Sequence, residues 1–230
     1  LSTSKNFADT SSQRRGYYRT YPTLGGFDQM TAVLGGFWDA MLGEGRHWWI
    51  TANSDSHVHY SEGGVDFWPG EYSKTYVYAQ KTYPSIIESL RSGKIFVTTG
   101  DLISEIFVTA RTTTNSAGIG ETLFYDGVQS IELSIKVKDP EGTNFAGRLA
   151  SLNHFDVIQG LISGKQQNPL NHNPSTKVIA RFFADDWQVD EQGYISVSLK
   201  IPISGSTYFR IRGSNHAEFE PSQDRPGEDP

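Results

Sequence analysis

The sequence predicts two architectures in one chain: an α/β part over residues 1–100 and an antiparallel β-sandwich over residues 101–230, with a polar C-terminal tail. Before residue 100, apolar residues at helical spacing alternate with short apolar runs, which is typical of α/β structure. After residue 100, several segments alternate apolar and polar residues and are separated by polar turns, which favours a sandwich. The 230 residues are 37% hydrophobic and 13% aromatic, enough to build hydrophobic cores.

The first expected element is helical and lies within residues 27–42. Apolar residues recur there at spacings of three and four, which indicates an amphipathic helix. The pair Gly35-Gly36 interrupts the pattern, so it fits either one kinked helix or a turn followed by a short helix. Gly43 and Gly45 predict the helix end.

The rest of the α/β part contains shorter signals. A long connection rich in Gly, Ser and aromatic residues covers residues 58–74, and long connections in compact domains are often functional. Pro84 suits the first turn of a helix that Gly93 ends. Short apolar runs predict strands over 48–52, 76–79 and 95–98.

The second half predicts a series of half-buried strands. Strict alternation gives each strand one apolar face, as an antiparallel sheet with one wet face requires. The expected inward-facing residues are Ile131, Leu133, Ile135 and Val137 in one strand, Val178, Ala180 and Phe182 in another, and Ile195, Val197 and Leu199 in a third. Further strands are expected over residues 103–108, 154–158 and 208–211.

Composition excludes several classes of function. The formal net charge is −6 and no run of Lys or Arg exists, so a nucleic-acid partner is not expected. No apolar stretch approaches the roughly 20 residues of a membrane span. There are no cysteines, which excludes disulfides and thiolate metal sites. No glycine-rich phosphate-binding loop lies between a strand and a helix, which argues against a nucleotide-binding protein.

The strongest candidate for chemistry follows the apolar run at residues 48–52. Asp55 and His57 stand two positions apart, and residues i and i+2 of an extended chain point to the same side. A carboxylate and an imidazole together suit a divalent cation such as zinc, manganese or iron. We therefore predict that Asp55 and His57 are metal ligands.

Three nearby residues are candidates for the surrounding pocket. His59 shares the side of Asp55 and His57 if the chain stays extended, and it fits the mouth of a pocket or an exposed position. Glu71 fits a metal or substrate ligand, or a carboxylate that stabilises the Pro69-Gly70 turn. Trp68 is a candidate for an aromatic residue that lines the pocket and contacts a ligand.

Five segments carry a resemblance to a known family: Ser54-Asp55-Ser56-His57, residues 37–42, 66–72 and 87–94, and Phe96-Val97-Thr98-Thr99-Gly100. Together they resemble the polymerase and histidinol phosphatase (PHP) family of metallohydrolases, whose fold is a distorted, TIM-like β/α barrel. The resemblance extends to a bacterial branch that includes a carbaryl-type esterase, in which a β-rich domain follows the barrel. It covers roughly residues 25–105.

The resemblance implies a hydrolase of phosphate or other small-molecule esters that uses bound divalent metals and a metal-activated water. Asp55 and His57 would be ligands of such a metal. PHP proteins also supply an early His-x-His pair, whereas the only such pair in this chain is His57-Val58-His59. The sequence is therefore expected to correspond to the C-terminal part of a PHP-like barrel, without the first barrel strands, followed by the sandwich.

An alternative is a non-catalytic binding or structural module, in which the sandwich recognises a carbohydrate or a protein partner. Trp187, Tyr194 and Tyr208 are its candidate sugar-binding aromatics, unless they belong to the core. Asp39 fits a structural role, because a carboxylate on the apolar face of a helix needs a partner. Arg46 is the nearby candidate for that partner. The sequence leaves the oligomeric state open.

Overall fold

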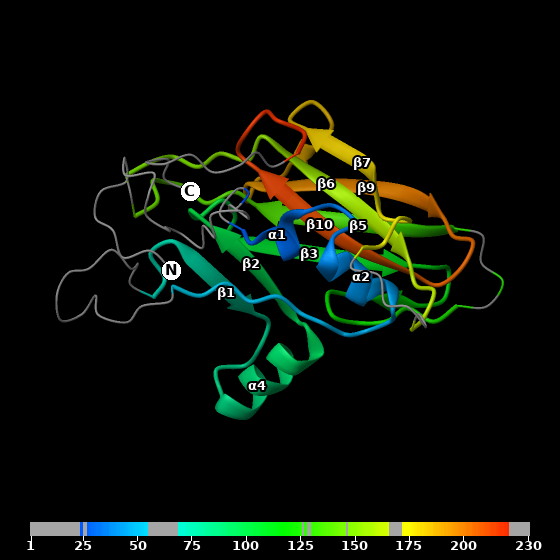
Figure 1. Cartoon of the computed structure of the whole chain (residues 1–230). Coiled ribbons are helices and arrows are strands. Elements are labelled where there is room, and N and C mark those ends of the chain that lie inside the picture. The colour runs from blue at the N-terminus through cyan, green and yellow to red at the C-terminus, as the bar shows by residue number, and fades with distance from the viewer. Residues whose placement is uncertain are drawn as a thin grey trace.

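The computed structural model describes residues 24, 27–54, 69–125, 127, 130–145, 147–165 and 172–220. Antiparallel sheets dominate these residues, and helices are few. Most of the described chain forms two facing sheets, with a two-stranded ribbon and three helices at their side (Figure 1). No helix in the described part of the chain is long and apolar enough to span a membrane.

The amino-terminal helical region is two short helices rather than one kinked helix. Helix α1 spans Gln29–Ala32 and α2 spans Phe37–Gly43. Gly35 adopts a φ of 72° between them, a backbone conformation that glycine takes at little cost. Helix α2 ends at the predicted Gly43, and it packs on strands β6 (His154–Leu161) and β10 (Thr207–Ser214).

A two-stranded antiparallel ribbon follows, made of β1 (Ser73–Val77) and β2 (Ile95–Thr99). Helix α4 (Tyr83–Ser92) connects the two strands and projects from the ribbon (Figure 1). Its predicted signals are confirmed, because Pro84 lies in the first turn and Gly93 is a left-handed C-cap with φ 75°. The described residues close no barrel, so the PHP-like barrel stays a prediction.

The predicted strand over residues 48–52 is wrong, because residues 46–54 belong to no sheet. The apolar character of this run has another cause. The Trp49 ring covers Gly93, where a Cβ would lie 2.3 Å from the indole, and its Nε1 donates to the Arg91 carbonyl at 2.9 Å. Trp49 therefore covers the C-terminus of α4, while Trp48 packs on Phe37 of α2 with 5.8 Å between ring centroids.

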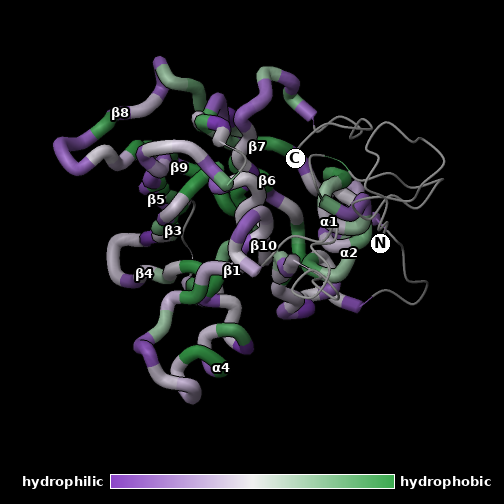
Figure 2. The backbone as a smooth tube through the Cα atoms, turned by 90° about the vertical axis from the view of Figure 1, so that its left-hand side faces the viewer, coloured by the Kyte–Doolittle hydropathy of each residue, from purple (hydrophilic) through white to green (hydrophobic). Residues whose placement is uncertain are grey.

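The β-rich half is a sandwich of two antiparallel sheets. The larger sheet has the order β4-β3-β5-β9-β8 and the smaller one β10-β6-β7. Figure 2 shows the two sheets side by side, with hydrophobic stretches of chain between them and hydrophilic turns at the rim. Their remaining strands are β3 (Glu105–Arg111), β4 (Ser116–Ala117), β5 (Ser130–Lys138), β7 (Lys177–Phe183), β8 (Gln188–Val189) and β9 (Tyr194–Pro202).

The core between the sheets matches the predicted faces of β5 and β9. In β7 the predicted Val178 is not part of the core, and Ile179 packs there beside Ala180 and Phe182, because the pairing of β6 with β7 shifts register between Val157 and Ile158. Strand β5 alternates buried and exposed residues, and Leu133 and Ile135 are each 1% exposed. Across the core, Phe155 and Val157 of β6 are 2% and 0% exposed. Strand β6 also buries its opposite face, where Asp156 is fully buried. This second buried face is covered partly by α2, which links the helices to the sandwich.

Candidate functional site

The chain leading to the predicted metal ligands is held against β1 by side-chain hydrogen bonds. The Ala52 amide donates to the Thr75 hydroxyl at 2.9 Å, and that hydroxyl donates to the Ala52 carbonyl at 3.0 Å. The Ser73 hydroxyl donates to the Asn53 carbonyl at 2.7 Å. A threonine side chain thus replaces the backbone hydrogen bonds expected for a strand here, and it fixes the position of residue 52 on β1.

The predicted site residues themselves fall mostly outside the described part. Asp55, His57, His59 and Trp68 lie outside the described residues. Glu71 is described, and it lies partly buried two residues before β1. Among the described residues, no group of three His, Asp or Glu side chains could hold a metal ion. The metal site therefore stays a prediction.

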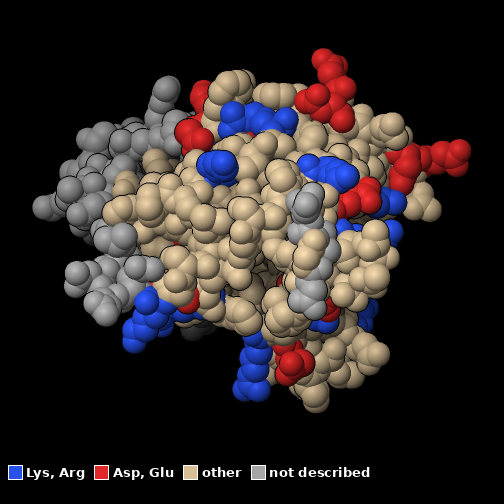
Figure 3. All heavy atoms as spheres, turned by 90° about the vertical axis from the view of Figure 1, so that its right-hand side faces the viewer, with Lys and Arg blue, Asp and Glu red and all other residues tan. Residues whose placement is uncertain are grey.

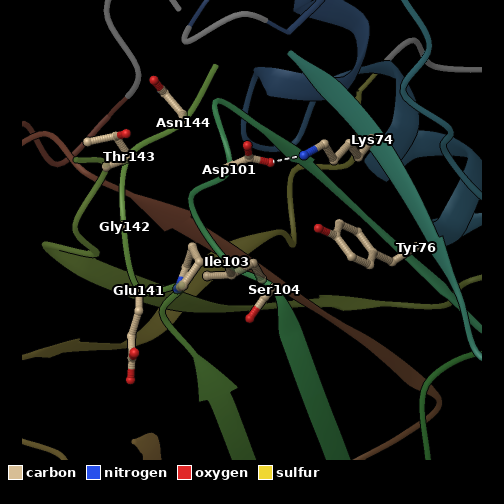
Figure 4. Close-up of a pocket in the computed structure, with 11 residues that line it drawn as sticks. Lys74, Tyr76, Asp101, Ile103, Ser104, Glu141, Gly142, Thr143 and Asn144 are labelled. Carbon is tan, nitrogen blue, oxygen red and sulfur yellow. Dashed lines mark hydrogen bonds and ion pairs between the residues drawn. The ribbon is translucent and has the colours of Figure 1, made fainter. Parts of the chain in front are cut away.

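A polar cavity of about 230 Å³ lies where the β1–β2 ribbon meets the sandwich. Figure 4 shows Lys74 and Tyr76 reaching into it from β1 and Asp101 meeting Lys74. Ile103 and Ser104 form another wall. The segment from Pro140 to Asn144 and Ala150 complete the lining.

The centre of this cavity is an ion pair between the Lys74 ammonium and the Asp101 carboxylate. Asp101 follows the end of β2 and is the one non-glycine residue with positive φ (57°) in the described chain. Gly100 before it also has a positive φ of 60°. Asn144 donates to the Gly100 carbonyl at 3.2 Å, which ties the turn after β5 to the turn after β2. Two left-handed residues thus aim Asp101 at Lys74.

The cavity and residues 52–53, which lead to Asp55 in the sequence, lie on opposite faces of β1. Successive side chains of a strand point to opposite faces. Ser73 and Thr75 hold residues 52 and 53 on one face, whereas Lys74 and Tyr76 line the cavity on the other. The Tyr76 ring stacks on Phe96 at 4.5 Å between centroids, which fixes it on the cavity side. The sequence predicted no part of this cavity.

Asp39 is paired with Arg210 rather than with Arg46, so the expected partner is wrong. The carboxylate is fully buried and accepts two bonds from the Arg210 guanidinium, at 2.8 and 2.7 Å. Arg46 instead pairs with Glu44 at 2.8 Å. The Gly35 amide and the Tyr208 hydroxyl also donate to Asp39, at 2.7 and 3.1 Å. This cluster joins α2 to β10, which supports the structural role predicted for Asp39.

The candidate sugar-binding aromatics do not form an exposed platform. Trp187 stacks on Phe155 at 5.9 Å and packs against the sandwich core. Tyr208 lies in the Asp39 cluster, where burial raises the pKa of its hydroxyl. Tyr194 lies on the outer face of the larger sheet, where it donates to Glu105 at 2.8 Å and meets the Lys136 ammonium.

A second buried charge cluster lies on the outer face of the smaller sheet. Asp156 accepts a bidentate bond from Arg181, at 2.6 and 2.9 Å, and a further bond from Arg212 at 2.7 Å. Both arginines also donate to the Phe219 carbonyl. Arg212 pairs in addition with Glu220 at 3.0 Å. The cluster therefore ties residues 219 and 220 to the sheet.

His154 lies beside this cluster and should make stability depend on pH. It is 3% exposed, and burial lowers its pKa, with Arg181 and Arg212 acting in the same direction and Asp156 opposing them. As pH falls below about 6.5, His154 binds a proton in the unfolded chain but stays neutral in the folded protein. Folding stability should therefore decrease as pH decreases through this window, by at most about 1.4 kcal/mol per pH unit for one group.

Urea unfolding between pH 7.5 and 5.5 would measure this dependence. His154→Gln should flatten the decline, because glutamine does not titrate. His172→Gln at an exposed position is the matched control and should leave the decline unchanged. Equal pH dependence in the wild type and His154→Gln would contradict the assignment.

Charged side chains on the face in Figure 3 are mixed, with Lys and Arg among Asp and Glu and a broad uncharged area between them. This face offers no continuous basic surface in its described part, in keeping with the net charge of −6. In comparisons with known proteins, the chain matches no protein-family model, no curated protein and no solved structure.

Proposed function

We propose that this chain is part of a metal-dependent hydrolase that acts on phosphate or other esters, and that its first hundred residues belong to a PHP-like barrel. The observation that supports the proposal is the anchoring of residues 52 and 53 on β1. Three hydrogen bonds between these residues and the side chains of Ser73 and Thr75 fix residues 52 and 53 along β1, shortly before the Asp-x-His motif. Functional loops are commonly carried in this way by a rigid scaffold.

The chemistry of the donors suits the proposed metal. Asp55 and His57 supply one carboxylate and one imidazole, which zinc, manganese and iron all accept. A catalytic zinc site takes three protein ligands and keeps one position for water or substrate. Glu71, two residues before the Ser73 that binds the Asn53 carbonyl, and His59 are the candidates for a third ligand here. A bound metal would lower the pKa of its water towards about 7 and polarise the scissile group.

The 230-residue chain alone should be a poor hydrolase. Two motif ligands can bind a metal ion, but they do not supply the complete donor set that activates a catalytic metal. We expect negligible turnover of p-nitrophenyl phosphate and of p-nitrophenyl acetate in the presence of added manganese or zinc. A steady-state assay of the purified chain, with Asp55→Ala as the control for background, measures this.

Rapid metal-dependent hydrolysis that Asp55→Ala abolishes would show that the ligand set in this chain is complete. Rapid metal-dependent hydrolysis that is equally fast in the wild type and in Asp55→Ala would remove the Asp-x-His motif from the chemistry.

A further inference from the structure

We propose that the cavity between the β1–β2 ribbon and the sandwich binds one neutral polyhydroxylated ring, such as a single hexose unit. The cavity lies on the face of β1 opposite residues 52 and 53, so this proposal is independent of the hydrolase proposal. It rests on four properties of the lining, which are its hydrogen-bonding groups, its charge balance, its size and its rigidity.

The cavity presents hydrogen-bond donors and acceptors that remain available to a ligand. The hydroxyls of Tyr76 and Thr143 make no hydrogen bond within the described residues. Lys74 uses one of its three N–H groups on Asp101, and Asp101 uses one of its two oxygens on Lys74. Each hydroxyl of a sugar both donates and accepts, so a mixed set of this kind can satisfy several of them at once.

The charge balance of the lining argues against an anionic ligand. Lys74 is the single cation among the lining residues, and it is already neutralised by Asp101. Glu141 is also among the lining residues, but its carboxylate points away from Lys74 and Asp101 (Figure 4). A phosphate would therefore meet one occupied cation beside the Asp101 carboxylate, whereas a neutral polyol can bind without a net change of charge.

The size and the walls fit one ring. A volume of 230 Å³ corresponds to about eight waters at roughly 30 Å³ each. It lies below the roughly 300–1,000 Å³ of pockets for drug-sized ligands. Ile103, Pro140 and Ala150 give the lining an apolar side. That side can pack against the C–H groups of a sugar ring, while its hydroxyls reach the polar groups.

The lining is held in place before any ligand binds. Tyr76 stacks on Phe96, and the Gly100 amide donates to the Tyr72 carbonyl at 2.9 Å. The Asn144 side chain bridges two turns, since its amide donates to Gly100 and its Oδ1 accepts from the Arg148 amide at 3.0 Å. A preorganised site loses little conformational entropy on binding, so a ligand that makes few contacts, such as a monosaccharide, can still bind measurably.

The test is a titration of the full 230-residue chain with D-glucose, D-galactose, D-mannose and myo-inositol, followed by protein-observed NMR. Inorganic phosphate forms a separate arm. We expect saturable binding of at least one of the four polyols in the millimolar range. Tyr76→Phe removes one hydroxyl and keeps the stack on Phe96, so it should weaken binding about three- to tenfold. Thr143→Val should weaken it by a similar factor.

Tyr83→Phe is the matched control, because Tyr83 is 88% exposed on α4 and is not among the residues that line the cavity. Its affinity should equal that of the wild type. Binding of none of the four polyols, tighter binding of phosphate than of any polyol, or unchanged polyol affinity in both cavity variants would overturn the proposal. Zinc affinity should be unchanged in Tyr76→Phe, which separates this result from any failure of the hydrolase proposal.

Discussion

Replacing Asp39 with alanine should lower the free energy of unfolding by about 3–5 kcal/mol, the cost typical of breaking a buried ion pair from one side. The substitution leaves the Arg210 guanidinium, which is 9% exposed, without its carboxylate. It also removes the acceptor for the Gly35 amide and the Tyr208 hydroxyl. A loss of this size is a large part of the 5–15 kcal/mol that stabilises an ordinary domain.

Urea unfolding of three variants would test this prediction. Lys94→Ala breaks the exposed pair with Glu121, in which the side chains are 43% and 44% exposed, and should cost at most about 1 kcal/mol. The double variant Asp39→Leu/Arg210→Met should be more stable than Asp39→Ala, because it leaves no unpaired buried charge. A loss of under about 1 kcal/mol in Asp39→Ala would show that the cluster does not hold α2 to β10.

Replacing Asp156 with alanine should cost about 3 kcal/mol or more, because one fully buried carboxylate serves two arginines. The side chains of Arg181 and Arg212 are each 17% exposed, so water can solvate part of the uncovered charge. The effect is therefore expected towards the lower end of the range for buried pairs. The backbone amides of residues 219 and 220 should also exchange their hydrogens faster, because the same arginines bind these residues.

Chemical denaturation and hydrogen exchange would measure the two effects together. Asp185→Ala is the matched control, since Asp185 is exposed and makes no ion pair within the described residues. It should change stability by no more than about 0.5 kcal/mol. Equal stabilities of Asp156→Ala and Asp185→Ala would refute a stabilising role for the Asp156 cluster.

Local signals explain which elements the sequence could predict. The limits of α4 follow from Pro84 and Gly93, and the faces of β5 follow from its strict alternation. The helix limits and the strand faces both depend on residues that are close together in the sequence. The strand prediction at residues 48–52 was wrong, because an apolar segment whose tryptophans cover the ends of two helices looks the same in sequence as a buried strand.

Long-range contacts explain what the sequence could not predict. Arg210 is 171 residues from Asp39, so no spacing rule leads from one to the other and the nearby Arg46 was the natural expectation. The cavity is likewise assembled from β1, the turn after β2 and the turn after β5. The single local signal for it was a Gly-Asp pair directly after a strand, where a turn with positive φ brings Asp101 to Lys74.

The most direct test of the proposed function is a calorimetric titration of the 230-residue chain with zinc at pH 7.5. The proposal predicts one saturable site, with affinity reduced at least tenfold in Asp55→Ala and in His57→Ala. His47→Ala is the matched control, because His47 stacks on Trp49 and is not among the predicted ligands, so its affinity should equal that of the wild type. Zinc affinity that is unchanged by both Asp55→Ala and His57→Ala, or lost only in His47→Ala, would contradict the metal-dependent function.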